Sequence, residues 1–306
     1  MTTTLHALRR RLTLAGGHAA SLTAIAVDGR RDEATYRPAT LIDAPLRHIA
    51  VGAPLAWPGD VGFLDGTQHV DLVGYVGTQP VVSAVVRAAV RLRIDRRLRS
   101  AITMVRRVVV ARAEAIAALG ALPDGVEPIA IDEDDPHPLR DLQHARGMVD
   151  RTRSRLEVAA ARAFRARNRE RWLIIDGGIS ATPEWGADPW VLGVVKSHAM
   201  LPFAGEELAI YLALPRGHRT SIFMPASRRV TPLYSWALRL HDFTGHDLFH
   251  GLVRIEAPAT DETIARADRL SQHLLAEVAP LSNDARADRL LYGIHDVERY
   301  LNALGR

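Results

Sequence analysis

Two short stretches of this 306-residue chain, Val61-Gly62-Phe63-Leu64-Asp65-Gly66 and Trp172-Leu173-Ile174-Ile175-Asp176-Gly177, share one pattern. Each is a short apolar run that ends in Asp-Gly, and such runs are typical of buried strands. A single Asp-Gly is as often a turn signal as a functional one. Because the pattern occurs twice, we predict two buried strands with a carboxylate at the end of each, where ligands of open α/β sheets collect.

The chemistry of this pair points to a cation. If Asp65 and Asp176 converge, their like charges need a positive ion between them, and oxygen ligands suit Mg²⁺ or Mn²⁺. Glu157, in a predicted helix before the second strand, lies near the apolar stripe of that helix rather than on its arginine-rich side. It is either a surface residue at the end of the stripe or a third ligand.

The remaining sequence predicts one mixed α/β domain over residues 1–306, with an N-terminal helix (1–28) and a central helical segment (102–168). Every even position over 82–94 is apolar, and the odd positions include Ser83, Arg87, Arg91 and Arg93, which favours a long strand. Residues 28–58 are turn-rich, and 120–138 are expected to be a loop. Further strands are predicted over 61–66, 70–77, 172–177, 190–196, 208–214, 221–224, 234–240 and 251–256. Helices are predicted over 1–28, 102–119, 139–167, 261–278 and 284–304.

Composition excludes several classes of protein. Apolar residues make up 47% of the chain and charged residues 24%, as in ordinary globular proteins. There is no cysteine, which excludes disulfides, thiolate zinc sites and cysteine nucleophiles. No stretch approaches the ~18 apolar residues of a membrane helix, and Gly16-Gly17-His18 interrupt the apolar region that a signal peptide needs. We therefore expect a soluble cytoplasmic protein.

The basic residues are almost all arginine. Of 39 basic residues, 38 are arginine and one is Lys196, and nine arginines lie in 87–112 and ten in 140–171. Guanidinium groups match phosphate oxygens, so these clusters suit a nucleic acid backbone, although solvated helix faces have the same composition. Lys196 is either an exposed strand-end residue or a point charge that contacts a phosphate.

A run of histidines is a weaker candidate for a metal site. His241, His246 and His250 have a spacing that invites a zinc interpretation, but Gly245 and the flanking strands favour a hairpin loop in which they do not converge. The sequence contains no G-x-S-x-G, P-loop, G-x-G-x-x-G or H-E-x-x-H motif, so the matching enzyme classes lack support.

Several short segments resemble, in order and spacing, the signature segments of the NurA nucleases. They are Phe63-Leu64-Asp65-Gly66-Thr67, Ile174-Ile175-Asp176-Gly177-Gly178, Gly193-Val194-Val195-Lys196-Ser197, Val253-Arg254-Ile255-Glu256 and Leu291-Tyr292-Gly293-Ile294-His295. The resemblance spans Asp65 to His295. It implies an RNase H-like (Piwi-like) mixed central sheet flanked by helices, a homodimer, and Mn²⁺-dependent (or Mg²⁺-dependent) degradation of DNA beside HerA, a hexameric DNA-translocating ATPase, in end processing, DNA repair or phage defence.

By the same resemblance the metal ligands are Asp65, Glu157, Asp176 and His295, with Lys196 as a further catalytic residue. Glu170 competes with Glu157 for the third acidic position. The family often has a Tyr-Pro eight residues before the histidine, and here that register falls on Ala287-Asp288. The resemblance therefore leaves open a catalytically impaired DNA-binding or assembly subunit, and another RNase H-like nuclease, beside the expected deoxyribonuclease with exonuclease, or exonuclease and endonuclease, activity.

Overall fold

In the computed structural model the described residues are 2–16, 18–19, 35–180, 182–226, 231–243, 246, 248–280 and 287–304. The strands are β1 (His18–Ala19), β2 (Thr35–Tyr36), β3 (Thr40–Leu41), β4 (His48–Ala50), β5 (Val61–Val76), β6 (Gln79–Ile94), β7 (Arg97–Arg112), β8 (Val126–Ile131), β9 (Trp172–Asp176), β10 (Val191–Val195), β11 (Met200–Leu201), β12 (His218–Thr220), β13 (Phe223–Met224), β14 (Leu233–Arg239) and β15 (Leu252–Pro258). The helices are α1 (Thr2–Leu14), α2 (Ala113–Leu119), α3 (Pro138–Arg165), α4 (Pro183–Ala187), α5 (Gly205–Leu212), α6 (Asp261–Leu275), the 3₁₀ turn η1 (Ala287–Arg289) and α7 (Tyr292–Ala303).

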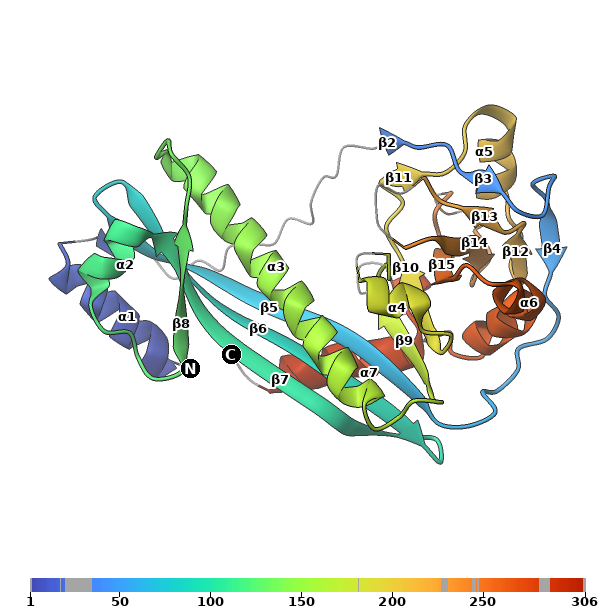
Figure 1. Ribbon diagram of the computed structural model, residues 1–306, viewed down its shortest axis with the longest axis horizontal. Coiled ribbons are helices and arrows are strands. Elements are labelled where there is room, and N and C mark those ends of the chain that lie inside the picture. The colour runs from blue at the N-terminus through green and yellow to red at the C-terminus, as the bar shows by residue number, and fades with distance from the viewer. Residues whose placement is uncertain are drawn as a thin grey trace.

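Thirteen of the described strands form one mixed sheet, whose main path runs β3-β13-β14-β15-β10-β9-β5-β6-β7-β8 (Figure 1). The three long strands β5, β6 and β7 pair antiparallel and extend away from the compact part of the molecule that holds β14, β15 and α6. The predicted mixed central sheet flanked by helices is confirmed. No helix among the described residues is long and apolar enough to cross a membrane.

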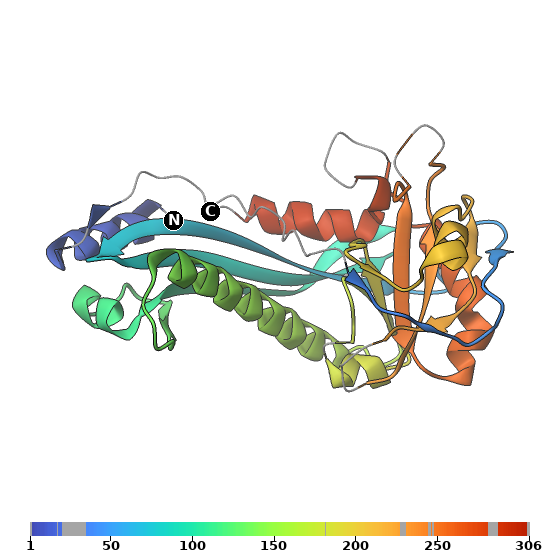
Figure 2. The same cartoon turned by 90° about the horizontal axis from the view of Figure 1, so that it is seen from above.

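The long strands are covered by helices on both faces. Figure 2 shows α3 along one face of β5–β7 and α7 on the other. Leu156 and Phe164 of α3 pack in one core cluster with Leu64 of β5 and Leu173 of β9. Leu291 and Ile294 at the start of α7 pack with Phe63 of β5 in a second cluster. We call these two sides of the sheet the α3 face and the α7 face.

One predicted helical region and one predicted loop are corrected by the structure. Residues 102–112, predicted as helix, belong to strand β7, and only Ala113–Leu119 form helix α2. The reason is that this segment is rich in β-branched residues, which favour strands, and that it pairs with β6 from Ile102 to Val110. The expected loop over 120–138 also contains β8, which pairs parallel with β7. The central segment 102–168 is therefore strand, short helix, strand and then the long helix α3.

The N-terminal helix is shorter than predicted. Helix α1 ends at Leu14, and Gly16 with its positive φ of 76° follows, a conformation that glycine adopts without strain. Residues 20–28 of the predicted helix lie outside the described residues. Leu8 and Leu12 are 1% and 0% exposed and pack against Val73 and Val81 of the long strands. The helix thus buries its apolar stripe within this chain.

The segment 208–214 is the other clear correction, because it is not a strand. Residues Gly205–Leu212 form helix α5, with Glu206 and Glu207 in its first turn, where negative charge is favourable. An uninterrupted apolar run has no period, so it does not distinguish a strand from a buried helix. The strands predicted separately over 61–66 and 70–77 form one strand, β5, so Asp65 lies inside a strand rather than at its end. The predicted strands over 82–94, 172–177, 190–196, 234–240 and 251–256 match β6, β9, β10, β14 and β15. Helix 261–278 matches α6, and the last helix begins at Tyr292 rather than at 284, a position outside the described residues.

Candidate active site

The two Asp-Gly motifs lie on neighbouring strands. Strands β5 and β9 pair in parallel, and Leu64 is the register partner of Ile175. Asp65 and Asp176 each follow one of these partners. Because side chains alternate along a strand, Asp65 lies on the same face as Phe63, and Asp176 on the same face as Ile174, which is the α7 face. The structure therefore places the two carboxylates on one face of neighbouring strands, close enough for the charge of Asp176 to act on Asp65.

Asp65 is the more buried of the two aspartates. It is 9% exposed, and its Oδ1 accepts a hydrogen bond from the backbone N–H of Gly66 at 2.7 Å. Burial raises the pKa of Asp65 well above its ordinary value, and the negative charges of Asp176 and then Glu157 raise it further, while Lys196 lowers it. A carboxylate in this position is costly to ionise without a cation beside it.

Glu157 lies on the α3 face, against Gly66, the chain neighbour of Asp65. A methyl group on Gly66 would lie 2.2 Å from Glu157 Oε1, so the absence of a side chain at Gly66 makes room for this carboxylate. Burial raises the pKa of Glu157, which the ion pair with Arg153 partly offsets. Glu170, the competing candidate, is exposed in the turn between α3 and β9. The structure thus places Glu157, and not Glu170, beside Asp65.

Lys196 follows β10 and its side chain is only 10% exposed. Its Nζ donates a hydrogen bond to Asp176 Oδ2 at 2.8 Å. The backbone oxygen of Lys196 accepts a hydrogen bond from Arg289 Nη1 at 3.2 Å, which ties this strand end to the η1 turn. The one lysine of the chain therefore lies in the carboxylate cluster rather than on an open surface.

His295 lies on the correct face but makes no described contact with the carboxylates. It belongs to the first turns of α7, which packs so closely on β5 that a methyl group on Gly293 would lie 2.4 Å from the Phe63 ring. The Nδ1 atom of His295 is buried and has no hydrogen-bond partner among the described residues. An unpartnered buried nitrogen is unusual and calls for a ligand or a proton partner.

These residues fit a divalent cation by donor type and charge. The raised pKa of Asp65 indicates a carboxylate without enough compensating positive charge, and the buried Nδ1 of His295 has no hydrogen-bond partner among the described residues. Within the described residues, however, no three histidine, aspartate or glutamate side chains are close enough to hold one ion as they stand. Asp176 is bonded to Lys196, and Glu157 to Arg153. The carboxylates are thus gathered but partly neutralised by the basic side chains of the chain itself.

The turn after Asp176 is held from both sides. Gly177 has a positive φ of 113° and its N–H donates to Val194 O at 2.8 Å. The N–H of Ile179 donates to Glu256 Oε2 at 2.9 Å. Glu256 is 3% exposed, and its other oxygen accepts a hydrogen bond from Arg254 Nη2 at 2.9 Å. Glu256 therefore fixes the position of the turn that carries Asp176.

No role for Glu256 was predicted from the sequence. A signal was present, because Arg254 and Glu256 are two charged residues at a spacing of two within an otherwise apolar strand. That spacing places both on one face. A charge pair on one face of a buried strand needs partners, and here each is the partner of the other.

The histidine run lies in the loop between β14 and β15, as the sequence predicts. The rings of His246 and His250 stack with centroids 3.9 Å apart and planes 9° apart. His250 Nδ1 lies 3.7 Å from Asp288 Oδ2, which is an ion pair if the histidine is protonated. Stacked rings direct their nitrogen lone pairs in parallel rather than toward one point, and no metal-binding group occurs here among the described residues.

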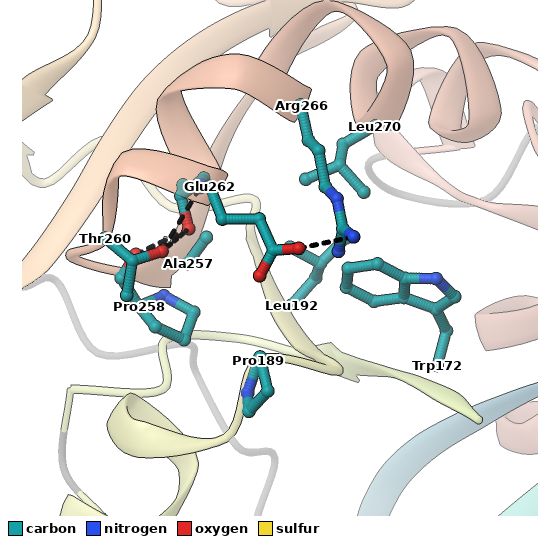
Figure 3. A pocket seen from close by; sticks show the side chains of 10 residues that line it. Trp172, Pro189, Leu192, Ala257, Pro258, Thr260, Glu262, Arg266 and Leu270 are labelled. Carbon is teal, nitrogen blue, oxygen red and sulfur yellow. Dashed lines mark hydrogen bonds and ion pairs between the residues drawn. The ribbon is translucent and has the colours of Figure 1, made fainter. Parts of the chain in front are cut away.

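A separate hollow beside β9 and α6 is too small for a substrate. Figure 3 shows it between Trp172, Leu192 and Leu270, with Glu262 and Arg266 paired across its mouth. Its volume of about 10 Å³ is room for about one water molecule. This hollow therefore plays no part in the candidate site.

Comparison with solved structures finds the crystal structure of the NurA nuclease from Sulfolobus solfataricus. The superposition covers 81% of this chain and 80% of that chain with a TM-score of 0.50, at 8% sequence identity. The chain has the fold of a NurA nuclease. The likeness extends over most of the chain and is consistent with the predicted mixed sheet flanked by helices. No protein-family model and no curated protein sequence matches the chain.

Proposed function

We propose that this protein is a divalent-metal-dependent deoxyribonuclease that hydrolyses phosphodiester bonds. The observation that carries the proposal is the placement of Asp65 and Asp176 on one face of neighbouring strands, with Lys196 bonded to Asp176 and with Glu157 close enough for its charge to act on Asp65. Crowded carboxylates with a nearby lysine are the groups that a phosphodiester hydrolase needs to hold cations and meet a phosphate. The NurA-like fold supports the same class of activity.

The cation would be held by Asp65 and Asp176, with Glu157 and His295 as further ligands. Mn²⁺ or Mg²⁺ suits this mainly carboxylate set. When bound, such an ion activates water and neutralises phosphate oxygens. A bound cation would matter most for Asp65. Lys196 bonds directly to Asp176, whereas among the described residues the buried Asp65 carboxylate has no positive charge as close to it.

The side chains of the protein supply the remaining tasks. The Lys196 ammonium, which bonds to Asp176, would meet the scissile phosphate as a point charge. Arg153, which pairs with Glu157, would lie beside the substrate as a second positive charge. Glu256 would keep the Asp176 turn in place throughout.

We further propose that the enzyme acts as an exonuclease, or as both an exonuclease and an endonuclease, on DNA. Its expected setting is cytoplasmic, as a homodimer beside a HerA-type hexameric ATPase, in DNA-end processing, DNA repair or phage defence. These partners rest on the segment resemblance to the NurA family, to which the shared fold lends support.

One observation favours a second candidate, a catalytically impaired DNA-binding subunit of the same complex. Lys196 and Arg153 already neutralise Asp176 and Glu157. An acidic cluster that is balanced by the chain's own cations can persist after metal binding has been lost. The raised pKa of Asp65 argues against this candidate, because it shows that the negative charge of this carboxylate is poorly neutralised by the chain's own cations.

Digestion of end-labelled DNA separates the two candidates. Single-stranded and double-stranded substrates are incubated with Mn²⁺, Mg²⁺, Ca²⁺ or EDTA, with a matched RNA strand in parallel. We expect cleavage of DNA with Mn²⁺, weaker or no cleavage with Ca²⁺, and none with EDTA or with the Asp176→Asn variant. DNA left uncut with every ion, alone and with the ATPase, would favour the impaired subunit. Cleavage of RNA alone would assign the site to another RNase H-like activity.

A further inference from the structure

The arginines of α3 and the turn after it divide into two groups. Of the ten in 140–171, five form ion pairs with carboxylates of the chain. These five are Arg140, Arg153, Arg162, Arg165 and Arg171. The other five are exposed and form no ion pair within the described residues. These are Arg146, Arg151, Arg155, Arg167 and Arg169. Half of the cluster is therefore used for internal pairing, and only the second group is available to a ligand.

Two arginines of the second group line a groove along α3. The groove has a volume of about 490 Å³, and its wall includes Arg151, Arg155 and Thr182. Arg151 and Arg155 are four residues apart, so their side chains lie one above the other on the helix, with Cβ atoms about 6 Å apart. Of the other charged groups of the wall, Arg162 pairs with Glu184, whereas Asp150 accepts a hydrogen bond from the neutral Gln68 amide at 2.7 Å and keeps its charge, so Arg151 and Arg155 leave the wall with a net positive charge.

The groove adjoins the candidate active site from two elements. On α3, the groove residues Ser154 and Val158 are the near neighbours of Glu157 along the helix. On the other wall, Thr182 comes six residues after Asp176, at the end of the turn that Glu256 holds. A ligand lying along this groove therefore leads toward the carboxylate cluster.

We propose that this groove binds the phosphate backbone of one nucleic acid strand next to the active site, with Arg151 and Arg155 contacting successive phosphates. The proposal rests on the proposed nuclease function, which supplies the substrate. Exposed guanidinium groups in a row along a helix match the regular spacing of a phosphate backbone, and their planar forks bind phosphate oxygens in pairs. The groove is lined by no aromatic side chain among the described residues, so it offers no platform for base stacking. Binding there is independent of sequence.

The test is the salt dependence of oligonucleotide binding. A fluorescent single strand of mixed sequence is titrated with protein in EDTA, so that no cleavage occurs, at several salt concentrations. The variant is Arg151→Ala/Arg155→Ala, and the matched control is Arg146→Ala/Arg167→Ala, which removes the same charge outside the groove wall. Circular dichroism melting confirms that both variants fold.

We expect the groove variant to weaken binding about tenfold near 0.1 M salt. It should also reduce the slope of log K against log salt by about 1.4, or ~0.7 for each lost phosphate contact to a single strand. The control variant should keep at least half of the wild-type affinity. An unchanged slope in the groove variant overturns the proposal, as does an equal loss in the control or a wild-type protein that does not bind the strand.

This outcome is separable from that of the proposed function. Binding is measured without metal. A protein that binds the strand through Arg151 and Arg155 but does not cleave DNA would therefore support the groove proposal and contradict the proposed nuclease function. A protein that cleaves DNA but whose groove variant binds the strand like wild type would support the proposed nuclease function and contradict the groove proposal.

Discussion

The two Asp-Gly motifs look alike in the sequence, but the structure holds them in different ways. Asp65 lies inside the 16-residue strand β5, is 9% exposed, and has a raised pKa. Asp176 is the last residue of β9, has a side chain that is 23% exposed, and is bonded to Lys196. One carboxylate is therefore positioned rigidly by the sheet at an electrostatic cost, while the other is positioned by a turn and its charge is already compensated by Lys196.

The largest expected effect is on catalysis, and it should be the same for both aspartates. Asp65→Asn and Asp176→Asn remove one charge each from the cation site. Changes to residues that only support a metal ligand cost about 10–100-fold, so we expect each substitution to lower the DNA cleavage rate in Mn²⁺ by more than ~100-fold. Rates on end-labelled DNA measure this. Normal cleavage by either variant would show that its aspartate is structural.

Substitution of Glu256 should disturb the position of Asp176, which a turn holds, but not that of Asp65, which the sheet holds. Glu256→Ala removes the acceptor for the Ile179 N–H, and we expect a loss of cleavage of about 10–100-fold. Gly178→Ala should also impair cleavage, because its new methyl group would lie 2.9 Å from Glu256 Oε2.

The two substitutions should not be additive. In the Glu256→Ala background the clash at residue 178 is gone, so Gly178→Ala should add little further loss. Cleavage rates of the four proteins form the cycle, and melting temperatures serve as the control for folding. Independent losses that multiply in the double variant would show that Glu256 acts on the site by some other route.

His295 should contribute less than the carboxylates. Its Nδ1 has no partner in the described part of the chain, and it lies on the face of both aspartates. We expect His295→Ala to lower the cleavage rate about tenfold, with DNA affinity unchanged because no phosphate contact is lost. His246→Ala, in the exposed loop between β14 and β15, is the matched control. Equal rates for the two variants would leave His295 as part of the helix surface.

The smallest expected effect is on stability, and it should separate the two aspartates. Because the pKa of Asp65 is raised in the folded protein, folding favours the protonated form, and stability is lost as pH rises from the ordinary aspartate range through the raised pKa. Asp65→Asn should therefore raise the melting temperature of the metal-free protein at pH 7 by about 2–4 °C. The gain should vanish near pH 4, where the wild-type carboxyl is also neutral.

Asp176→Asn should give no such gain. It removes a negative charge near Asp65, but it also leaves the half-buried Lys196 without its carboxylate. Melting curves of both variants at pH 4 and pH 7 make the comparison. Equal gains for both at pH 7 would mean that the two aspartates share one environment.

The sequence predicted the parts of the fold that have a clear period or a repeated motif. The alternation over 82–94 gave β6, and the repeated Asp-Gly runs gave β5, β9 and the central pair of the site. The predictions were wrong where the local pattern was ambiguous. Residues 102–112 became strand because β6 is available to pair with them, and 208–214 became helix because an all-apolar run has no period.

The site shows the same division. Asp65 and Asp176 were visible because each ends an apolar run, whereas the roles of Glu256 and Arg153 depend on contacts between segments distant in the sequence or between turns of a helix. The choice between Glu157 and Glu170 depended on which residue faces Gly66, and only the packing of α3 on β5 settles that placement.

Direct binding of Mn²⁺ tests the central claim, that Asp65 and Asp176 together form a cation site. Isothermal titration of the metal-free protein at pH 7.5 would be compared with Asp65→Asn, Asp176→Asn and the control His246→Ala. The account predicts binding by wild type and control, and a loss of at least about tenfold in affinity for each aspartate variant. Mn²⁺ binding that is absent from the wild type, or that is unchanged in both aspartate variants, would contradict it.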